Sequence, residues 1–192
     1  YTLAAAAIIG PTGVVYAVDL WAEGIAALQD RAAQEGLTNL KALVAPAGQV
    51  PLADCSVDVA LMATVLHDLM EAGTGTGALK ELARVLKPGG LFFFDTYNRT
   101  LISKLAVIKV SQEWKRWAFL PPGIHEWRMF IKPGELKTLL SDLDTPTPLL
   151  LDFIGGLGGA DITALQVERV IDRTCAAARG EEQPPVTWLS LE

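Results

Sequence analysis

The stretch GVVYAVDL, residues 13–20, restricts the possible fold more than any other part of the chain. Its β-branched run predicts a buried strand over 14–18 that is followed directly by the acid Asp19. In nucleotide-binding βαβ units, an acid at this position binds ribose hydroxyls and follows a glycine-rich loop by about 20 residues. Counting back from Asp19 passes Tyr1, so the sequence holds no such loop before the strand. A simple role for Asp19 in capping the next helix is an equally good alternative.

Predicted strands and helices alternate over the first half of the chain, which is the pattern of a parallel sheet with right-handed crossovers. A length of 192 residues favours a single domain, residues 1–192. The apolar patterns predict helices over 2–9, 22–35, 77–86, 135–143 and 161–178, and strands over 14–18, 40–45, 57–62, 91–95, 149–154 and 186–191.

Composition and charge exclude several classes of protein. The net charge of −6 argues against a general nucleic-acid binder, and a small-molecule partner is expected instead. No apolar run approaches the roughly 18 residues that span a bilayer. Cys55 and Cys175 form no CxxC pair, so they indicate neither a disulfide framework nor a metal site. We therefore expect a cytoplasmic protein without a bound metal ion.

Two motifs carry a resemblance to a known family: PLADCSVDVALMATVLHDL, residues 51–69, and ELARVLKPGG, residues 81–90. Together with the order of the elements over residues 1–95, they resemble the fourth and fifth strand regions of class I S-adenosylmethionine-dependent methyltransferases. The resemblance implies an α/β, Rossmann-like sheet, mostly parallel with helices on both faces. It also implies S-adenosylmethionine as the cofactor and methyl transfer as the reaction.

Members of that family carry a first strand and a glycine loop directly before a helix like the one over 2–9. The resemblance therefore implies that the domain is incomplete at its N-terminus, with the central first strand missing and its two neighbours lacking a ladder partner. We interpret 149–154 and 186–191 as the last two strands of the family fold. The alternative is a circular permutation, in which the segments 149–161 and 186–192 supply the missing unit.

The resemblance also implies which residues bind the cofactor. Asp19 and Leu20, directly after the strand over 14–18, should bind the ribose of the cofactor. Ala63, directly after the strand over 57–62, is also expected to contact the cofactor. Where family members often have an acid for the adenine amino group, this chain has Pro46, which offers neither a carboxylate nor an N–H. The backbone of Ala47–Gly48 is then expected to recognise adenine.

In the second half, FFFDTYNRT and LPPGIHEWRMFIKPGEL, residues 92–100 and 120–136, resemble the ubiquinone-biosynthesis O-methyltransferases. This resemblance implies O-methylation of a small hydrophobic phenol or quinol. Such a reaction benefits from a base near the acceptor oxygen. The candidates are His125, which Glu126 could orient, and His67, although a lone histidine is more often structural.

Residues 99–130 are predicted to form an insertion that is either a helical lid or a membrane-facing segment. Over 100–120, apolar residues are mixed with the basic residues Lys104, Lys109, Lys115 and Arg116 and with the aromatic residues Trp114 and Trp117. Basic charge beside tryptophan is typical of peripheral membrane contact, whereas an apolar stripe more often packs on its own domain. Both interpretations remain open at this stage.

Two other functions are compatible with Asp19. An NAD-dependent oxidoreductase would use the same acid for ribose, but LKPGG and the absence of a Tyr-x-x-x-Lys pair argue against it. A degenerate, non-catalytic methyltransferase-like binding domain is the third hypothesis, because the glycine loop is absent and Pro46 replaces an acid.

Overall fold

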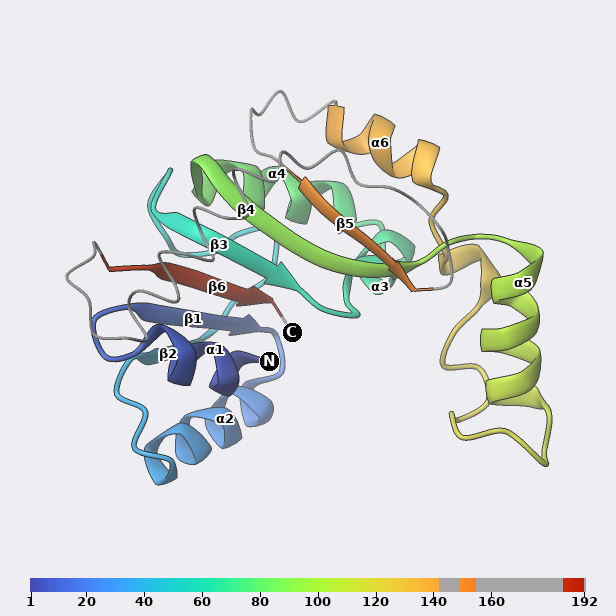
Figure 1. Ribbon diagram of the computed structural model, residues 1–192, viewed down its shortest axis with the longest axis horizontal. Helices are drawn as coiled ribbons and strands as arrows, with labels where there is room; N and C mark the ends of the chain where they lie inside the picture. Colours follow the sequence, from blue (N-terminus) through green and yellow to red (C-terminus); the bar gives the residue numbers. More distant parts are fainter. Residues whose placement is uncertain (142–148, 155–184, 192) are drawn as a thin grey trace.

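A computed structural model describes residues 1–141, 149–154 and 185–191, and its centre is an open sheet of six strands (Figure 1). Every strand pair in the sheet is parallel, so all the carboxyl ends lie at one edge. The strands are β1 (Val14–Asp19), β2 (Leu40–Val44), β3 (Val57–Met62), β4 (Leu86–Tyr97), β5 (Leu149–Ile154) and β6 (Thr187–Leu191). Their order across the sheet is β2-β1-β6-β3-β4-β5.

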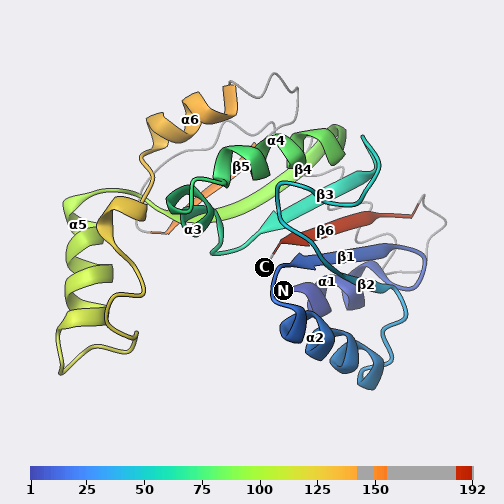
Figure 2. The ribbon, with the colours of Figure 1, turned by 180° about the vertical axis from the view of Figure 1, so that it is seen from behind.

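Helices cover both faces of this sheet (Figures 1 and 2). The α-helices are α1 (Thr2–Ile9), α2 (Ala22–Gln34), α3 (Leu66–Glu71), α4 (Gly75–Val85), α5 (Leu101–Ser103) and α6 (Pro133–Ser141). A π-helix, η1 (Lys104–Glu113), continues α5, and a 3-10 turn, η2 (Trp127–Met129), precedes α6.

The apolar core is divided by the sheet. On one face, α1 and α2 bury Ile9 and Ile25 against the side chains of β1, such as Val15 and Ala17. On the other face, α3, α4 and α6 belong to one core cluster with residues of β1, β3 and β4, among them Val18. This two-sided packing of a parallel sheet confirms the predicted fold class.

Strand β6 lies in the middle of the sheet and pairs with β1 on one side and β3 on the other. The predicted gap beside two unpaired strands is therefore wrong, because residues 187–191 fill it. Our interpretation of 149–154 and 186–191 as the closing strands of the family fold is also wrong, since β5 lies at the edge and β6 at the centre. The central position of β6 agrees with the permuted alternative. The glycines over 155–159, the predicted helix over 161–178, Cys175 and Glu192 lie outside the described residues.

Two polar contacts hold β6 in this position. The carboxylate of Asp58, which is 4% exposed, accepts hydrogen bonds from the backbone N–H of Thr187 at 3.0 Å and from Lys87 Nζ at 2.9 Å. At the other end of the strand, Thr2 Oγ1 donates to Ser190 Oγ at 2.9 Å. The start of α1 and the end of β6 consequently lie side by side at the carboxyl edge (Figures 1 and 2).

The LKPGG motif forms a bulge at the start of β4. The ladder between β3 and β4 shifts register there, so Lys87–Gly90 leave the regular pairing that resumes at Leu91. Gly89 has a φ of +78°, and a Cβ on Gly90 would lie 2.9 Å from the Lys87 carbonyl oxygen. The bulge therefore requires both glycines. It also makes β4 begin before the predicted strand over 91–95.

Replacing Asp58 by Ala should lower the free energy of unfolding by about 1.5–3 kcal/mol, because the first N–H of β6 loses a charged acceptor. Asp58→Asn keeps an acceptor oxygen and should cost less. Denaturant unfolding monitored by circular dichroism measures both, and Asp30→Ala on the exposed face of α2 is the control. Equal stabilities of the Asp58→Ala and Asp30→Ala variants would contradict this role.

Candidate active site

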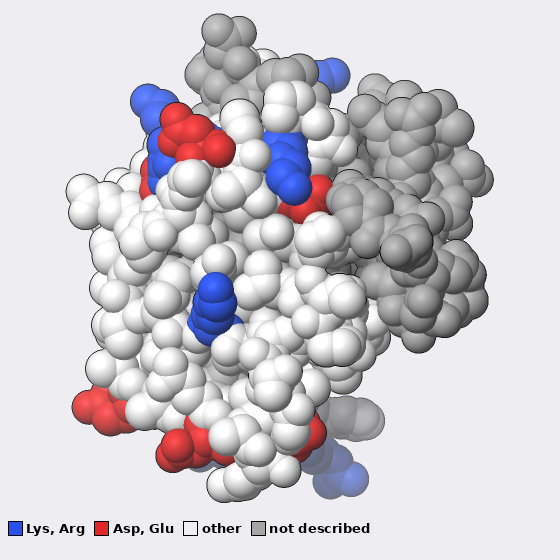
Figure 3. Space-filling model, turned by 90° about the vertical axis from the view of Figure 1, so that its left-hand side faces the viewer, with Lys and Arg blue, Asp and Glu red and all other residues white. Residues whose placement is uncertain are grey.

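The carboxyl edge of the sheet collects the predicted cofactor-binding residues. Asp19 and Leu20 lie at the end of β1, Ala63 follows β3, and Ala47–Gly48 follow β2. Parallel sheets bind ligands outside this edge. The opposite edge, where the strands begin, is covered mostly by uncharged residues, and its charged side chains lie mainly toward its margins (Figure 3).

Asp19 is half-buried, and one of its carboxylate oxygens is already used. Oδ1 accepts a hydrogen bond from the backbone N–H of Trp21 at 2.9 Å, which fixes the turn into α2. Among the described residues no group donates to Oδ2, so this oxygen is available to a ligand. Leu20 is 69% exposed and presents its side chain to solvent beside the carboxylate. Asp19 does not cap α2 itself, because the N-cap is Trp21 and, among the described residues, no side chain accepts from the first turn of the helix.

The loop that carries Ala47–Gly48 is held from α4 by Arg84 and Glu81, which pair with each other, and Arg84 also forms an ion pair with Asp54 of the loop. Arg84 donates to the carbonyl oxygens of Val50 and Leu52 at 3.0 and 2.9 Å, and to Glu81 Oε1 and Oε2 at 2.7 and 2.9 Å. Glu81 in turn accepts from the Val50 N–H at 2.8 Å. The hydrogen bond from Arg84 lowers the pKa of Glu81 below its usual value of 4.5, although burial opposes the shift.

The turn that follows β3 is strained at Thr64. This residue has a φ of +58°, a conformation that is rare for a β-branched side chain. Its hydroxyl donates to the carbonyl oxygen of Ala63 at 2.8 Å. Backbone strain of this kind costs roughly 1–3 kcal/mol and is concentrated at functional sites. Thr64 therefore marks the predicted cofactor edge, and sequence reasoning did not single it out.

The two histidines of the chain meet at the carboxyl end of β4. The ring centroids of His67 and His125 are 5.2 Å apart, and Tyr97 lies 5.7 Å from the first and 5.2 Å from the second. Phe130 packs against Tyr97 at 4.9 Å. Two candidates that the sequence could only treat separately thus form one aromatic cluster. Tyr97 was not predicted, although it ends the strand in the quoted motif FFFDTYNRT.

The two histidines differ in exposure. His67 is 1% exposed within α3, with Nε2 at 3.6 Å from Asp68 Oδ1, which suits a packing role. His125 is half-buried, and its Nδ1 is enclosed without a hydrogen-bond partner among the described residues. The predicted orienting acid, Glu126, instead accepts from Arg128 Nε at 2.7 Å. Of the two predicted bases, His125 is therefore the more exposed.

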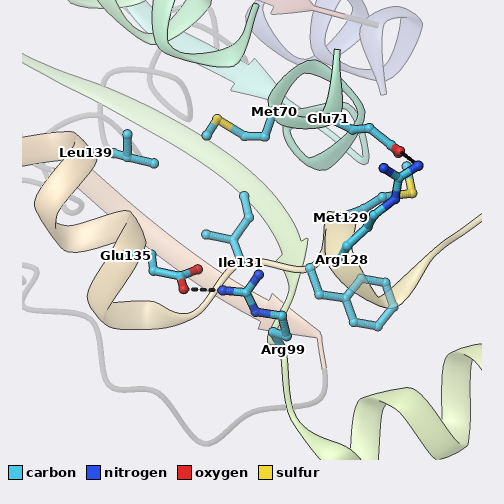
Figure 4. Close-up of a pocket in the computed structure, with 9 residues that line it drawn as sticks. Met70, Glu71, Arg99, Arg128, Met129, Ile131, Glu135 and Leu139 are labelled. Atoms are coloured by element: carbon cyan, nitrogen blue, oxygen red, sulfur yellow. Dashed lines mark hydrogen bonds and ion pairs between the residues drawn. The ribbon is translucent and has the colours of Figure 1, made fainter. Parts of the chain in front are cut away.

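A cavity of about 290 Å³ adjoins this cluster, because Phe130 belongs to both. Figure 4 shows the side chains that line the cavity. Arg99, from the quoted NR pair, forms an ion pair with Glu135, and Arg128 forms one with Glu71. Each arginine at the cavity is thus compensated by a carboxylate, which favours an uncharged ligand. The lining consists of Met70, Glu71, Arg99, Arg128, Met129, Phe130, Ile131, Glu135 and Leu139.

Beyond β4, the segment formed by α5, η1 and residues 114–124 projects away from the sheet (Figures 1 and 2); we call it the hairpin. Its burial pattern is inverted, since Ser103, Ser111 and Gln112 are buried while apolar residues face outward. The exposed apolar side chains are Leu101, Ile102, Leu105, Trp114, Trp117, Phe119 and Ile124. Exposed apolar residues gathered in this way mark an interaction surface.

The described ranges contain neither a membrane-spanning helix nor a cluster of metal-ligating side chains. No helix there is long and apolar enough to cross a membrane. No three His, Cys, Asp or Glu side chains come together there in a way that could hold a metal ion. The prediction of a site without metal stays a prediction.

Comparisons with known proteins agree with this geometry. Residues 2–94 match the family model described as a methyltransferase domain. This match covers just under half of the chain. A solved S-adenosylmethionine-dependent methyltransferase from Methanosarcina mazei has the same fold, with a TM-score of 0.54 at 23% identity over 73% of this chain and 72% of that one. The predicted recognition and fold are confirmed, and S-adenosylmethionine is the cofactor that they indicate.

Two curated relatives are named ubiquinone biosynthesis O-methyltransferase. The protein of Caulobacter vibrioides is 41% identical over 85 residues, which are 44% of this chain and 31% of the relative. The protein of Hahella chejuensis is 36% identical over 111 residues, covering 53% of this chain and 46% of the relative. The chain therefore spans less than half the length of either relative.

Acidification should loosen the loop around Val50. Because the pKa of Glu81 is lowered in the folded chain, its stabilising contribution is complete above about pH 4.5 and is lost as the pH falls through the lower, folded-state pKa. Hydrogen exchange at the Val50 amide, corrected for its intrinsic pH dependence, should rise in this range. The Glu81→Gln variant should exchange faster at neutral pH and lose the pH step.

Glu35→Gln provides the control for this measurement, since Glu35 pairs with Arg31 on the exposed surface of α2. It should leave exchange at Val50 unchanged. An identical pH step in the Glu81→Gln variant would assign the loosening to another group.

Proposed function

We propose that this methyltransferase domain transfers a methyl group from S-adenosylmethionine to an oxygen of a small hydrophobic phenol or quinol. The observation that carries the proposal is the meeting of His67 and His125 next to a cavity whose charged side chains are paired, at the same sheet edge as Asp19. The names of the two relatives support this class of acceptor. The charge-compensated cavity supports an uncharged one.

The residues at the carboxyl edge fit the cofactor. The free Oδ2 of Asp19 is an acceptor for a ribose hydroxyl, and the Ala47–Gly48 backbone offers its own polar groups to adenine in place of the missing acid. Ala63 has a small side chain next to the strained turn, which leaves room for a ligand. When bound, S-adenosylmethionine supplies an electrophilic methyl group.

The contribution of the chain is to orient the acceptor and to take its proton. Nδ1 of His125 is closed to solvent and has no hydrogen-bond partner among the described residues, so we expect it to take the proton of a phenolic hydroxyl once the acceptor binds against the ring. His67 and Tyr97 pack around the His125 ring and restrict its motion. Alignment of the acceptor oxygen with the methyl donor supplies much of the rate, because it replaces the entropy of a chance encounter.

Calorimetry that compares the binding of S-adenosylmethionine and of NAD to the 192-residue chain tests which of the two is the cofactor. We expect S-adenosylmethionine to bind and NAD to fail. Asp19→Ala should weaken S-adenosylmethionine binding by roughly 1–3 kcal/mol, the range for a lost hydrogen bond to a charged group. The exposed Glu23→Ala, in the first turn of α2, should have no effect.

Methyl transfer to a hydrophobic catechol, followed by mass spectrometry of the product, completes this test. Binding of NAD alone would support an oxidoreductase, and binding of neither nucleotide would support a degenerate binding domain. Binding without transfer to any phenol or quinol would refute the proposed acceptor.

We further propose that the hairpin makes peripheral contact with an anionic lipid surface. Its outward apolar side chains include Leu101, Ile102 and Phe119, which are 76–78% exposed. Basic residues Lys115 and Arg116 lie between exposed Trp114 and Trp117 and complement anionic headgroups. A surface-bound hairpin suits an acceptor that partitions into the bilayer, and the apolar residues of a lid would instead face the sheet.

Removing charge and aromatic groups from the hairpin should reduce sedimentation with phosphatidylglycerol vesicles. The double variant Lys115→Gln with Arg116→Gln should weaken the free energy of vesicle binding by about 2 kcal/mol, because each basic residue near an anionic membrane surface contributes about 1 kcal/mol. Trp114→Ser with Trp117→Ser should weaken binding at all salt concentrations. Trp21→Ser, at an equally exposed tryptophan before α2, is the matched control.

Binding to neutral phosphatidylcholine should be weaker for the unaltered chain. Equal sedimentation of the hairpin variants and the Trp21→Ser control would show that the hairpin does not contact lipid.

A further inference from the structure

We infer that Gln112 is a positioning residue that holds His125 in place for proton transfer. The inference rests on the proposed function, because it assigns Gln112 a role in the action of the same base. It is carried by one arrangement of hydrogen bonds between the hairpin and the loop that contains His125.

Gln112 binds both backbone groups of His125. Its Oε1 accepts from the His125 N–H at 3.0 Å, and its Nε2 donates to the His125 carbonyl oxygen at 3.2 Å. The same Nε2 donates to the carbonyl oxygen of Val107 at 3.1 Å. One side chain thus connects the η1 backbone to both polar backbone groups of the candidate base.

The amide of Gln112 is 3% exposed, which makes its identity specific. A buried primary amide is stable only when its donors and its acceptor are paired, and here all of them are. An apolar side chain of similar size would leave the N–H and the carbonyl of His125 without these partners. The burial therefore serves the loop rather than the apolar core.

The helix that carries Gln112 is itself unusual. Residues 104–113 wind as a π-helix, in which the Trp114 N–H reaches the Lys109 carbonyl at 2.8 Å. Runs of π-helix are rare and occur frequently at functional sites. This widened turn presents Gln112 toward the loop, while Trp114, just beyond the helix, is exposed.

Other contacts between the hairpin and the loop lie beyond His125. Trp127 Nε1 donates to the Thr100 carbonyl at 3.1 Å, and Lys104 Nζ lies 4.7 Å from the Trp127 ring centroid. They hold the loop as a whole, but Gln112 fixes the backbone at His125 itself. Since the imidazole contacts His67 and Tyr97 through its ring, fixing this backbone fixes the direction of Nδ1.

The decisive experiment compares Gln112→Ala, Gln112→Glu, His125→Gln and Ser111→Ala in the full chain. Ser111 is the matched control, because it is also buried on η1 but its hydroxyl bonds only to Val107 within the helix. The readouts are hydrogen exchange at the His125 amide and the pH profile of kcat for methyl transfer to a hydrophobic catechol.

We expect Gln112→Ala to raise exchange at the His125 amide and to lower kcat by up to roughly a hundredfold, the scale of a misplaced reacting group. KM for S-adenosylmethionine should not change. The His125→Gln variant should lose one limb of the pH profile of kcat. In the Gln112→Ala variant, the same limb should be shifted or flattened. Gln112→Glu keeps the acceptor for the His125 N–H and should restore part of the rate, and Ser111→Ala should match the unaltered chain.

Each outcome decides between the two proposals. Unchanged exchange at His125 in Gln112→Ala, or raised exchange with an unaltered kcat and pH profile, would overturn the positioning role alone. Failure of the unaltered chain to methylate any phenol or quinol would overturn the proposed function and this role with it.

Discussion

The central position of strand β6 is the constraint on which the rest of the structure depends. Strands β1 and β3 carry Asp19 and Ala63 at their carboxyl ends, yet they pair only through β6. The buried carboxylate of Asp58 fixes the first N–H of that strand. Without β6, two rows of backbone groups would lose their partners, and no ladder would set the spacing of the cofactor-binding residues.

A single short segment after β3 connects the two halves of the candidate site. The strained turn at Thr64 follows Ala63 at the cofactor edge, and α3 begins two residues later. The first turn of α3 then places His67 against His125 and Tyr97. Methyl transfer requires the acceptor oxygen to align with the donor, and a segment that holds both sides is suited to that. The position that this turn gives to both sides of the site therefore offsets the cost of its backbone strain.

Local patterns explain what could be predicted from the sequence. The strand before Asp19 follows from its β-branched run, the helix over 2–9 from its alanine-rich composition, and the helix over 22–35 from its apolar spacing. A parallel sheet then necessarily brings its carboxyl ends together. The location of β6 did not follow, because a short apolar strand reads the same at the centre and at the edge of a sheet. The roles of Tyr97 and Gln112 depend on contacts between residues far apart in the sequence, which no periodicity encodes.

The hairpin places opposite chemistries on its two sides within a few residues. Gln112 faces inward and forms hydrogen bonds with the backbone of His125, whereas Trp114 faces outward and is 61% exposed. A soluble helix would bury its apolar residues and expose its amide, so this inversion is costly unless each side has a partner. If the chain has the proposed function, the partner of the inner side is the base His125. The partner of the outer side is the lipid surface that delivers a hydrophobic acceptor. The same ten-residue π-helix then serves both the chemistry and the access to it.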